Sequence, residues 1–447
     1  MTVWAKSALR QKENAMSRPL AGFAPDLTAL PARRAPLLEL DLTVVTPLFG
    51  GGAIARKVDR ERPVSGKAVR GHLRFWWRAC RGAGYVAAQE LFEAEARIWG
   101  STELPSPVGL EIDILDKGRI VRWAEYRERW NQRTGRMQTF LDRHPPYPGY
   151  ALFPFQGEID RGTVIEDASD ALRGVRFRLR LTGAEAHRAD VEAAVWAWIL
   201  FGGVGARVRR GCGTLSCEDP RFQPGLEALT EGASGRISPG ERLLPIPLLG
   251  QARVLLGRPT GAAAGQESVQ QAWVTAIAAM QEFRQGYGVG RRAGPGRSFW
   301  PEPDSLREMT GMSEPHHRPE HRARRFYPRA DLGLPIVFKF KDNGDPSVRI
   351  LQAMGDQATR MASPIILKAL PLPGNLALPM AVLFNAPHVW DTDAPRVGFG
   401  GAALAVNELN DGHKSALVPP MRGKATAREA FFDFAQAKWS GKEITLP

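Results

Sequence analysis

Cysteine, lysine and long apolar runs are scarce in this sequence of 447 residues. Its three cysteines, Cys80, Cys212 and Cys217, form no CxxC pair and have no adjacent histidines, which argues against a disulfide framework and against a zinc site. No apolar run reaches the roughly 18 residues of a membrane span, and the first residues lack the apolar core of a signal peptide. We therefore expect a soluble, cytoplasmic protein with no membrane partner.

Positive charge is abundant, and it is unevenly distributed. The formal net charge is +13. Residues 53–81, 117–150, 203–215 and 284–300 together carry a net charge of +19, so the remainder of the chain is net −6. Cationic segments on a mildly acidic body are typical of a groove that follows a phosphate backbone.

Apolar periodicity predicts an α+β fold. The elements expected in the first half are strands at 38–46, 108–115, 175–181 and 212–218, and helices at 66–81, 87–98 and 189–201. Their order, β-α-β-β-α-β, is that of the ferredoxin-like or RRM-like arrangement, here with long insertions and glycine-rich loops. A weaker signal places helices at 267–284 and 427–439, a strand at 336–341 and apolar runs at 363–370 and 378–384.

Composition divides the chain into four segments. They are a flexible tail at 1–35, a first ferredoxin-like domain at 36–220 with an insertion at 117–170, a Pro- and Gly-rich linker at 221–250, and a second, divergent ferredoxin-like domain at 251–447. A faint echo between 201–213 and 287–298, where a glycine-arginine stretch follows an Ala- and Trp-containing helix, suggests duplication.

The helix at 66–81 separates its arginines from its aromatic residues. At about 100° per residue, Arg70, Arg74 and Arg78 share one stripe, whereas Trp76 and Trp77 occupy the neighbouring sector and are expected in the core. A row of like charges can be a solvated face. Because no acid stands at i,i+4 to pair with the row, we favour a bound polyanion such as RNA.

Two further segments suit an RNA backbone. In GGVGARVRRGCG at 202–213 the glycines allow close backbone approach, and Arg207, Arg209 and Arg210 have no acidic neighbour. On the strand at 175–181 three arginines share the solvent face, which is either a cationic RNA surface or a solvated edge. In the insertion, cations alternate with Trp130 and other aromatics, which suits either base stacking or packing against a partner subunit.

Signals for catalysis are few. His316, His317 and His321 are spaced like metal ligands, but no carboxylate motif accompanies them and their loop holds five arginines, so we interpret it as a solvated basic loop with no metal. Asp59 is the one carboxylate near the presumed backbone track. An endoribonuclease that uses Asp59 or His72 as general acid or base is the alternative hypothesis.

Several stretches together resemble the RAMP proteins of CRISPR systems. They are TPLFGGG at 46–52, RPVSGKAVRGHLRFWWRA at 62–79, ELFEAEARIWGS at 90–101, YPGYALF at 147–153, GGVGARVRRGCGTL at 202–215, GPGRSFWP at 294–301, YPRADLGLPIVFKFK at 327–341 and RMASPIILK at 360–368. The similarity is greatest to the Cmr subunit of type III-B effector complexes that lies toward the 3′ end of the guide RNA.

This resemblance implies two ferredoxin-like domains and a non-catalytic, cofactor-free RNA-binding subunit in antiviral defence. The implied partners are CRISPR guide RNA, target RNA and the other Cmr subunits of a ribonucleoprotein, with target cleavage left to neighbouring subunits. Cleaving RAMP subunits carry an aspartate where Asp59 lies, but the residues around it follow the non-cleaving pattern. The predicted RNA contacts are Arg56, Lys57, Lys67, Arg70, Arg74, Arg78, Arg207, Arg209, Arg210, Arg291, Arg292 and Arg297.

Overall fold

The structure is a computed structural model. It describes residues 36–447 apart from positions 133, 145, 260–264, 293–296, 355–359, 392–395 and 401. The predicted tail at 1–35 lies outside the described residues. None of the described helices combines the length and the apolar composition that a membrane crossing requires.

A first four-stranded sheet carries the predicted order of elements. Its strands are β1 (Pro36–Val44), β3 (Gly109–Asp116), β10 (Arg176–Thr182) and β11 (Leu215–Cys217), which lie in the order β11-β1-β10-β3 with antiparallel neighbours. Two helices connect them, α2 (Gly66–Arg81) after β1 and α5 (Arg188–Phe201) after β10, and α3 (Ala88–Trp99) follows α2. The alternation in β1 buries its leucines against the helices and leaves Glu39 and Asp41 exposed.

A second four-stranded sheet repeats this arrangement. Its strands are β12 (Leu248–Leu256), β15 (Ile365–Leu372), β16 (Leu376–Asn385) and β19 (Lys442–Thr445), in the order β15-β16-β12-β19, again with antiparallel neighbours. Helix α7 (Gly265–Gln285) follows β12 and α11 (Ala427–Trp439) follows β16. In both sheets the first and third strands along the chain are the central pair.

This correspondence differs from the one suggested by the sequence echo. The echo aligns the segment after α5 with the segment after α7, but α5 follows the third strand of its sheet and α7 follows the first strand of its own. By topology α7 corresponds to α2, and α11 corresponds to α5. The repeat is therefore one of topology, and the glycine-arginine echo does not mark equivalent positions.

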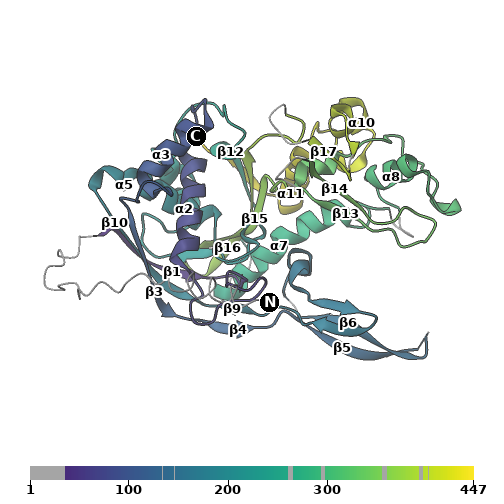
Figure 1. The fold of residues 1–447 in the computed structure, drawn as a ribbon, viewed down its shortest axis with the longest axis horizontal. Helices are drawn as coiled ribbons and strands as arrows, with labels where there is room; N and C mark the ends of the chain where they lie inside the picture. Colours follow the sequence, from purple (N-terminus) through teal and green to yellow (C-terminus); the bar gives the residue numbers. More distant parts are fainter. Residues whose placement is uncertain are drawn as a thin grey trace, which may run out of the picture. The chain divides into compact units, whose positions relative to one another are not determined.

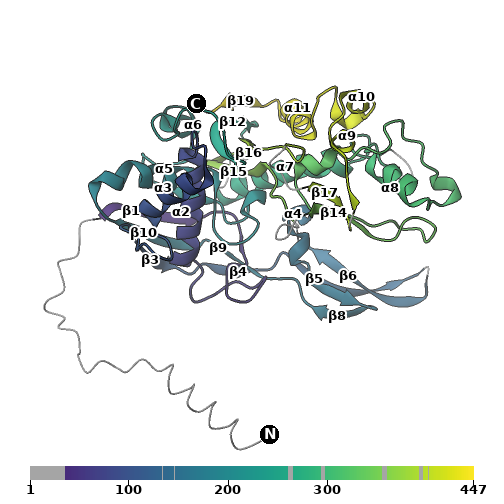
Figure 2. The same ribbon diagram turned by 45° about the horizontal axis from the view of Figure 1, so that its top comes forward.

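The first sheet, the helices α2 and α5, the second sheet, and the helices α7 and α11 follow one another as layers (Figures 1 and 2). One apolar cluster joins the inner face of the first sheet, α2, α5 and one face of the second sheet, and Trp76 of α2 stacks on Phe384 of β16 at 5.9 Å. A second cluster joins the other face of the second sheet to α7 and α11. Since both its faces are covered, β15 is buried along nearly its whole length and does not alternate.

The expected insertion between β3 and β10 forms β-structure. It contains β4 (Arg119–Val121), the hairpin of β5 (Ala124–Asn131) and β6 (Arg136–Arg143), the hairpin of β7 (Glu158–Asp160) and β8 (Thr163–Glu166), and α4 (Gly149–Leu152). β4 joins β9 (Ala171–Arg173) and β2 (Leu48–Phe49) in a small sheet. In both views the β5–β6 hairpin extends away from the first sheet (Figures 1 and 2).

The strand expected at 336–341 lies outside the second four-stranded sheet. As β13 (Ile336–Phe338) it joins β14 (Arg349–Met354), β17 (Arg396–Phe399) and β18 (Ala402–Ala403) in a separate sheet. Its apolar cluster includes Leu306 of α8 (Glu302–Thr310) and Leu409 of α9 (Val406–Leu409), and α10 (Gly412–Ala416) follows in the chain. The segment predicted as a linker contains α6 (Leu226–Thr230) and buries Phe222 and Leu229.

Candidate nucleic-acid interface

The arginine stripe of α2 packs against α3. Trp76 and Trp77 are 3% exposed, as the helical periodicity predicts. Arg74 and Arg78 both donate hydrogen bonds to the carboxylate of Glu95, which is buried in α3. The expectation that this stripe has no acidic partner is therefore wrong. The i,i+4 criterion examines one helix, whereas Glu95 reaches the stripe from the next helix.

Arg70, at the start of the same stripe, holds the turn between α3 and β3. Its guanidinium donates to the Ser106 hydroxyl at 2.7 Å and to the main-chain oxygens of Val108 and Trp99 at 3.1 and 3.3 Å. Burial, together with the charge of Arg74, lowers the pKa of Arg70. Three bonds to fixed partners make Arg70 a structural residue of the turn, and leave Lys67 as the exposed cation of the first helical turn.

The glycine-arginine loop lies against the second sheet, with its guanidinium groups directed inward. Arg207 donates to the oxygen of Ala151 at 3.0 Å, Arg209 to that of Ser363 at 2.5 Å, and Arg210 to that of Ile365 at 2.9 Å. Burial lowers the pKa values of Arg209 and Arg210 to about 10, so both remain charged at neutral pH. In the sequence, the absence of acidic neighbours favoured contact with phosphate. In the structure, main-chain oxygens of the same chain accept hydrogen bonds from all three arginines.

The glycines of this loop do allow close backbone approach. Gly213 has φ of +63°, and a Cβ placed on it would lie 1.9 Å from the main-chain oxygen of Val204. Gly211 has φ of +76°, and its oxygen accepts a hydrogen bond from the buried Thr46 hydroxyl at 2.6 Å. The loop is thus tightly packed between the segment that follows β1, the end of α5 and β15.

The solvent face of the first sheet carries charges of both signs. Arg178 of β10 pairs with Asp41 of β1 at 2.7 Å, and Arg180 pairs with Glu39 at 2.8 Å. Arg180 also pairs with Glu111 of β3 at 3.0 Å. The expectation of a cationic face is wrong because the neighbouring strands place carboxylates directly opposite the arginines. The face is solvated, but β10 is not the edge strand that the alternative supposed, because it lies between β1 and β3.

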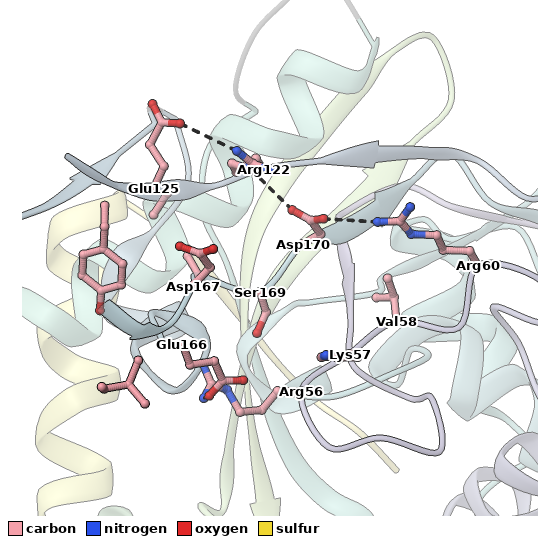
Figure 3. Close-up of a pocket in the computed structure, with 14 residues that line it drawn as sticks. Arg56, Lys57, Val58, Arg60, Arg122, Glu125, Glu166, Asp167, Ser169 and Asp170 are labelled. Carbon is pink, nitrogen blue, oxygen red and sulfur yellow. Dashed lines mark hydrogen bonds and ion pairs between the residues drawn. The ribbon is translucent and has the colours of Figure 1, made fainter. Parts of the chain in front are cut away.

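A cavity of about 610 Å³ lies beside the loop that follows β2. Arg56, Lys57 and Arg60 line it from that loop, and the segments 122–126 and 165–170 of the insertion complete it (Figure 3). Figure 3 shows the Asp170 carboxylate between Arg60 and Arg122. Its Oδ2 atom lies 3.5 Å from Nη2 of Arg60, and its Oδ1 atom lies 3.6 Å from Nε of Arg122.

Arg56 and Lys57 differ in their access to a ligand. Arg56 pairs with Glu166, and its Nε and Nη2 atoms are buried without a hydrogen-bond partner. Lys57 is exposed and forms no ion pair with any described residue. The cavity therefore offers both cationic groups and carboxylates to a ligand.

The two residues considered for catalysis have local roles. The Asp59 carboxylate accepts hydrogen bonds from the main-chain N–H groups of Glu61 and Arg62, both at 2.9 Å, and so shapes the loop. His72 stacks on Trp198 with ring centroids 6.3 Å apart, and burial lowers its pKa. Among the described residues, neither side chain forms a hydrogen bond or an ion pair with another acidic or basic side chain.

The predicted arginines after α7 are also paired. Arg297 reaches Asp304 at 3.3 Å and Glu320 at 3.4 Å, and Arg292 lies 3.9 Å from Glu320. Arg291 stands over the ring of Tyr287 at 3.7 Å. Residues 293–296, between these arginines, lie outside the described part of the chain.

Several exposed cations form no ion pair with any described residue. In the two most cationic segments of the sequence they include Lys57, Arg62, Lys67, Arg119, Arg129 and Arg136, and others such as Arg97, Arg176 and Lys341 lie elsewhere on the described chain. Four of the six named in those two segments were not among the predicted contacts. At the β5–β6 hairpin, Trp130 and Met137 face each other across the strands and are 59% and 55% exposed. Because strand side chains alternate, Arg129 and Arg136 lie on the opposite face of this hairpin, where Arg129 stands 4.6 Å over the ring of Phe140.

Comparisons with known proteins agree on one family. Residues 41–216 match the RAMP superfamily model. The chain is 32% identical over 188 residues to the CRISPR system Cmr subunit Cmr1-2 of Pyrococcus furiosus. The aligned region covers 40% of this chain and 93% of that protein. It is 27% identical over 159 residues to subunit Cmr1-1 of the same organism, covering 35% of this chain and 41% of that protein.

Two solved structures are also similar. The apo crystal structure of Cmr1 from Pyrococcus furiosus aligns with a TM-score of 0.46 and 16% identity, over 91% of this chain and 97% of that one. A chain of the type III-B Cmr-beta complex bound to cognate target RNA and AMPPnP, determined by cryo-electron microscopy in the presence of single-stranded DNA, aligns with a TM-score of 0.43 and 11% identity. That alignment covers 91% of this chain and 100% of the other.

Proposed function

Since the chain belongs to the RAMP superfamily, among the Cmr1 subunits of CRISPR Cmr systems, we propose that it is a non-catalytic RNA-binding subunit of a type III-B effector complex. In this role it contacts guide RNA and the guide-target duplex, lies toward the 3′ end of the guide, and acts in antiviral defence in the cytoplasm. Its protein partners are the other Cmr subunits.

We assign the architecture to two ferredoxin-like domains. The first spans 36–220 with its insertion at 117–170, the second spans 251–447, and 221–250 connects them. The support is that both four-stranded sheets have the same strand order and the same helix positions along the chain.

The observation that carries the proposal is the set of exposed, unpaired cations on the loop after β2, the start of α2 and the insertion. An exposed cation with no internal partner repels its neighbours until an anion binds, and a polyphosphate backbone supplies several anions at once. Lys57, Lys67 and Arg62 are the first contacts we assign. The internally bonded arginines of α2 and of the glycine-arginine loop position this surface and contribute to its potential.

Single-stranded RNA fits this surface better than a base-specific duplex. Trp130 presents an exposed aromatic ring on one face of the β5–β6 hairpin, with Arg129 and Arg136 on the other face. Aromatic stacking together with backbone neutralisation binds RNA with little base preference. The exposed apolar tip is also the feature that suits a partner subunit, as the sequence alone already suggested.

The test is a binding titration of labelled single-stranded RNA with the full chain at several salt concentrations. We expect Lys57→Ala, Arg62→Ala and Lys67→Ala together to weaken affinity by about tenfold or more, and to reduce the salt slope by about 2, since each lost phosphate contact removes about 0.7 from it. A control of equal charge change combines Arg178→Ala, Arg221→Ala and Arg422→Ala, all ion-paired elsewhere. Equal losses in both variants would contradict the assignment.

The nuclease alternative has a separate test. Labelled RNA incubated with the purified chain should remain intact, and the Asp59→Ala variant should behave identically. Cleavage by the wild type that disappears in Asp59→Ala would overturn the non-catalytic assignment. Native mass spectrometry of material purified from cells tests the partners, since it should reveal Cmr subunits and a bound guide RNA.

A further inference from the structure

Two histidines and an aspartate from distant parts of the sequence converge beside α8. His316 and His317 lie in the short 3-10 helix Pro315–His317, and Asp342 lies in the turn after β13. One ligand atom from each of the three lies within 4.8 Å of the others. From this geometry we propose a transition-metal site, for Zn²⁺ or a similar nitrogen-preferring divalent ion, held by His316, His317 and Asp342.

The two separations that involve Asp342 suit a tetrahedral ion. The Oδ2 atom of Asp342 lies 3.3 Å from Nδ1 of His317 and 3.7 Å from Nε2 of His316. For metal-ligand bonds of about 2.1 Å, these separations correspond to ligand-metal-ligand angles of about 104° and about 124°, on either side of the tetrahedral angle. A set of three protein ligands leaves the fourth position for water or another ligand.

Hydrogen bonds hold the segment of His316 and His317 next to the segment of Asp342. Arg307 of α8 donates two hydrogen bonds of 2.8 Å to Asp345, whose side chain is 1% exposed. Asp345 also lies 2.9 Å from Nδ1 of His317, the atom assigned to the metal, so a bound ion replaces this contact. Glu314 accepts a hydrogen bond from the N–H of Gly344 at 2.8 Å and so joins the segments again. Such support keeps ligand atoms in place before a metal arrives.

The surrounding charge permits a cation, contrary to the interpretation from sequence. That interpretation rested on five loop arginines and on the absence of a carboxylate. Three of those arginines form ion pairs away from the cluster: Arg324 and Arg325 with Glu308, and Arg329 with Glu302. The other two, Arg318 and Arg322, are exposed and form no ion pair with a described residue. Asp342 and Asp345 supply the carboxylates, from a turn about 25 residues downstream. Sequence spacing could not find them, because the convergence depends on the fold.

The third histidine of the sequence cluster is not a ligand. His321 uses one ring nitrogen to contact the oxygen of Phe299 at 3.0 Å and the other to accept from the N–H of Ala323 at 3.1 Å. The site is therefore two histidines and a carboxylate. Imidazole ligands favour zinc, cobalt, nickel or copper over magnesium and calcium.

The site is independent of the RNA-binding proposal, and its test needs no RNA. The untagged full chain is stripped with a chelator, dialysed and titrated with Zn²⁺ by calorimetry. In parallel, Co²⁺ is used as a visible-absorption probe of tetrahedral coordination. We expect one ion per chain. His316→Ala and Asp342→Asn should each weaken binding by at least about tenfold, because even changes outside the ligand shell cost that much.

The variants are chosen to leave folding intact. The side chains of His316 and Asp342 are 67% and 43% exposed, so their loss removes little packing. The matched control is His413→Ala, which removes an exposed histidine of α10 and should bind Zn²⁺ like the wild type. Absence of 1:1 binding, or equal affinity in all four proteins, would overturn the site.

Discussion

The ammonium group of Lys368 donates a hydrogen bond to the main-chain oxygen of Gly202 at 2.8 Å, and both lie in the interior. Lys368 belongs to β15 of the second sheet, and Gly202 ends α5 of the first half. No ion pair with a described residue accompanies this bond. Burial lowers the pKa of Lys368 to about 7.

This pKa predicts stability that rises with pH. Between about pH 7 and 8.5 the unfolded chain keeps the Lys368 proton while the folded chain releases it, so the free energy of unfolding increases by up to about 1.4 kcal/mol per pH unit. Burial raises the pKa of the Cys80 and Cys212 thiols to about 12. Above that pH range these thiols therefore lower the free energy of unfolding as the pH rises. Urea unfolding at several pH values measures the slope.

The matched substitutions are Lys368→Met and Lys442→Met. The first removes the buried amine and should abolish the slope between pH 7 and 8.5. The second removes an exposed lysine of β19 and should retain it. A slope that survives in Lys368→Met would show that another group titrates there.

Glu95 should stabilise the contact between α2 and α3. Glu95→Gln keeps the shape but removes the charge that Arg74 and Arg78 share, and we expect a loss of about 2–3 kcal/mol in the free energy of unfolding. Glu93→Gln, at an exposed site of the same helix, should change it by less than about 0.5 kcal/mol. Similar small losses in both variants would mean that the two arginines do not depend on Glu95.

Gly213 tests the close approach in the glycine-arginine loop. Gly213→Ala combines a positive φ with a clash against the Val204 oxygen, and should destabilise the chain by about 3 kcal/mol or more. The comparison is Gly235→Ala, because Gly235 has φ of +70° with no atom within 4 Å of the added Cβ. It should cost only the backbone strain, about 1 kcal/mol. Thermal unfolding of the two variants separates the contribution of the clash from that of backbone strain. Equal losses of stability in both variants would show that the clash contributes nothing.

Trp130 at the hairpin tip should matter for binding and little for folding. Trp130→Ala removes a side chain that is 59% exposed, so the melting temperature should be unchanged, whereas affinity for single-stranded RNA should fall by about five- to tenfold, as for the loss of one stacked base. Val337→Ala, at a 52% exposed residue of β13, should alter neither. Unchanged RNA affinity with impaired assembly of the subunits would instead identify the tip as a protein contact.

Local sequence was enough to predict the elements that depend on near neighbours. The helix predicted at 66–81 matches α2 in both bounds, and the tryptophans predicted in its core are buried. Periodicity reports these features because side chains three and four positions apart share a face whatever the rest of the chain does. The RAMP resemblance also came from the sequence, through motifs that stand in a fixed order.

The partners of the charged groups were decided by the tertiary structure alone. Glu95 reaches Arg74 across 21 positions, Asp41 reaches Arg178 across 137, and Ser363 accepts from Arg209 across 154. A charge pattern along the chain cannot show such pairs, because they form only when strands and helices distant in sequence pack together. The sequence by itself therefore determined where positive charge is concentrated, and the fold decided which of those charges remain free to meet a ligand.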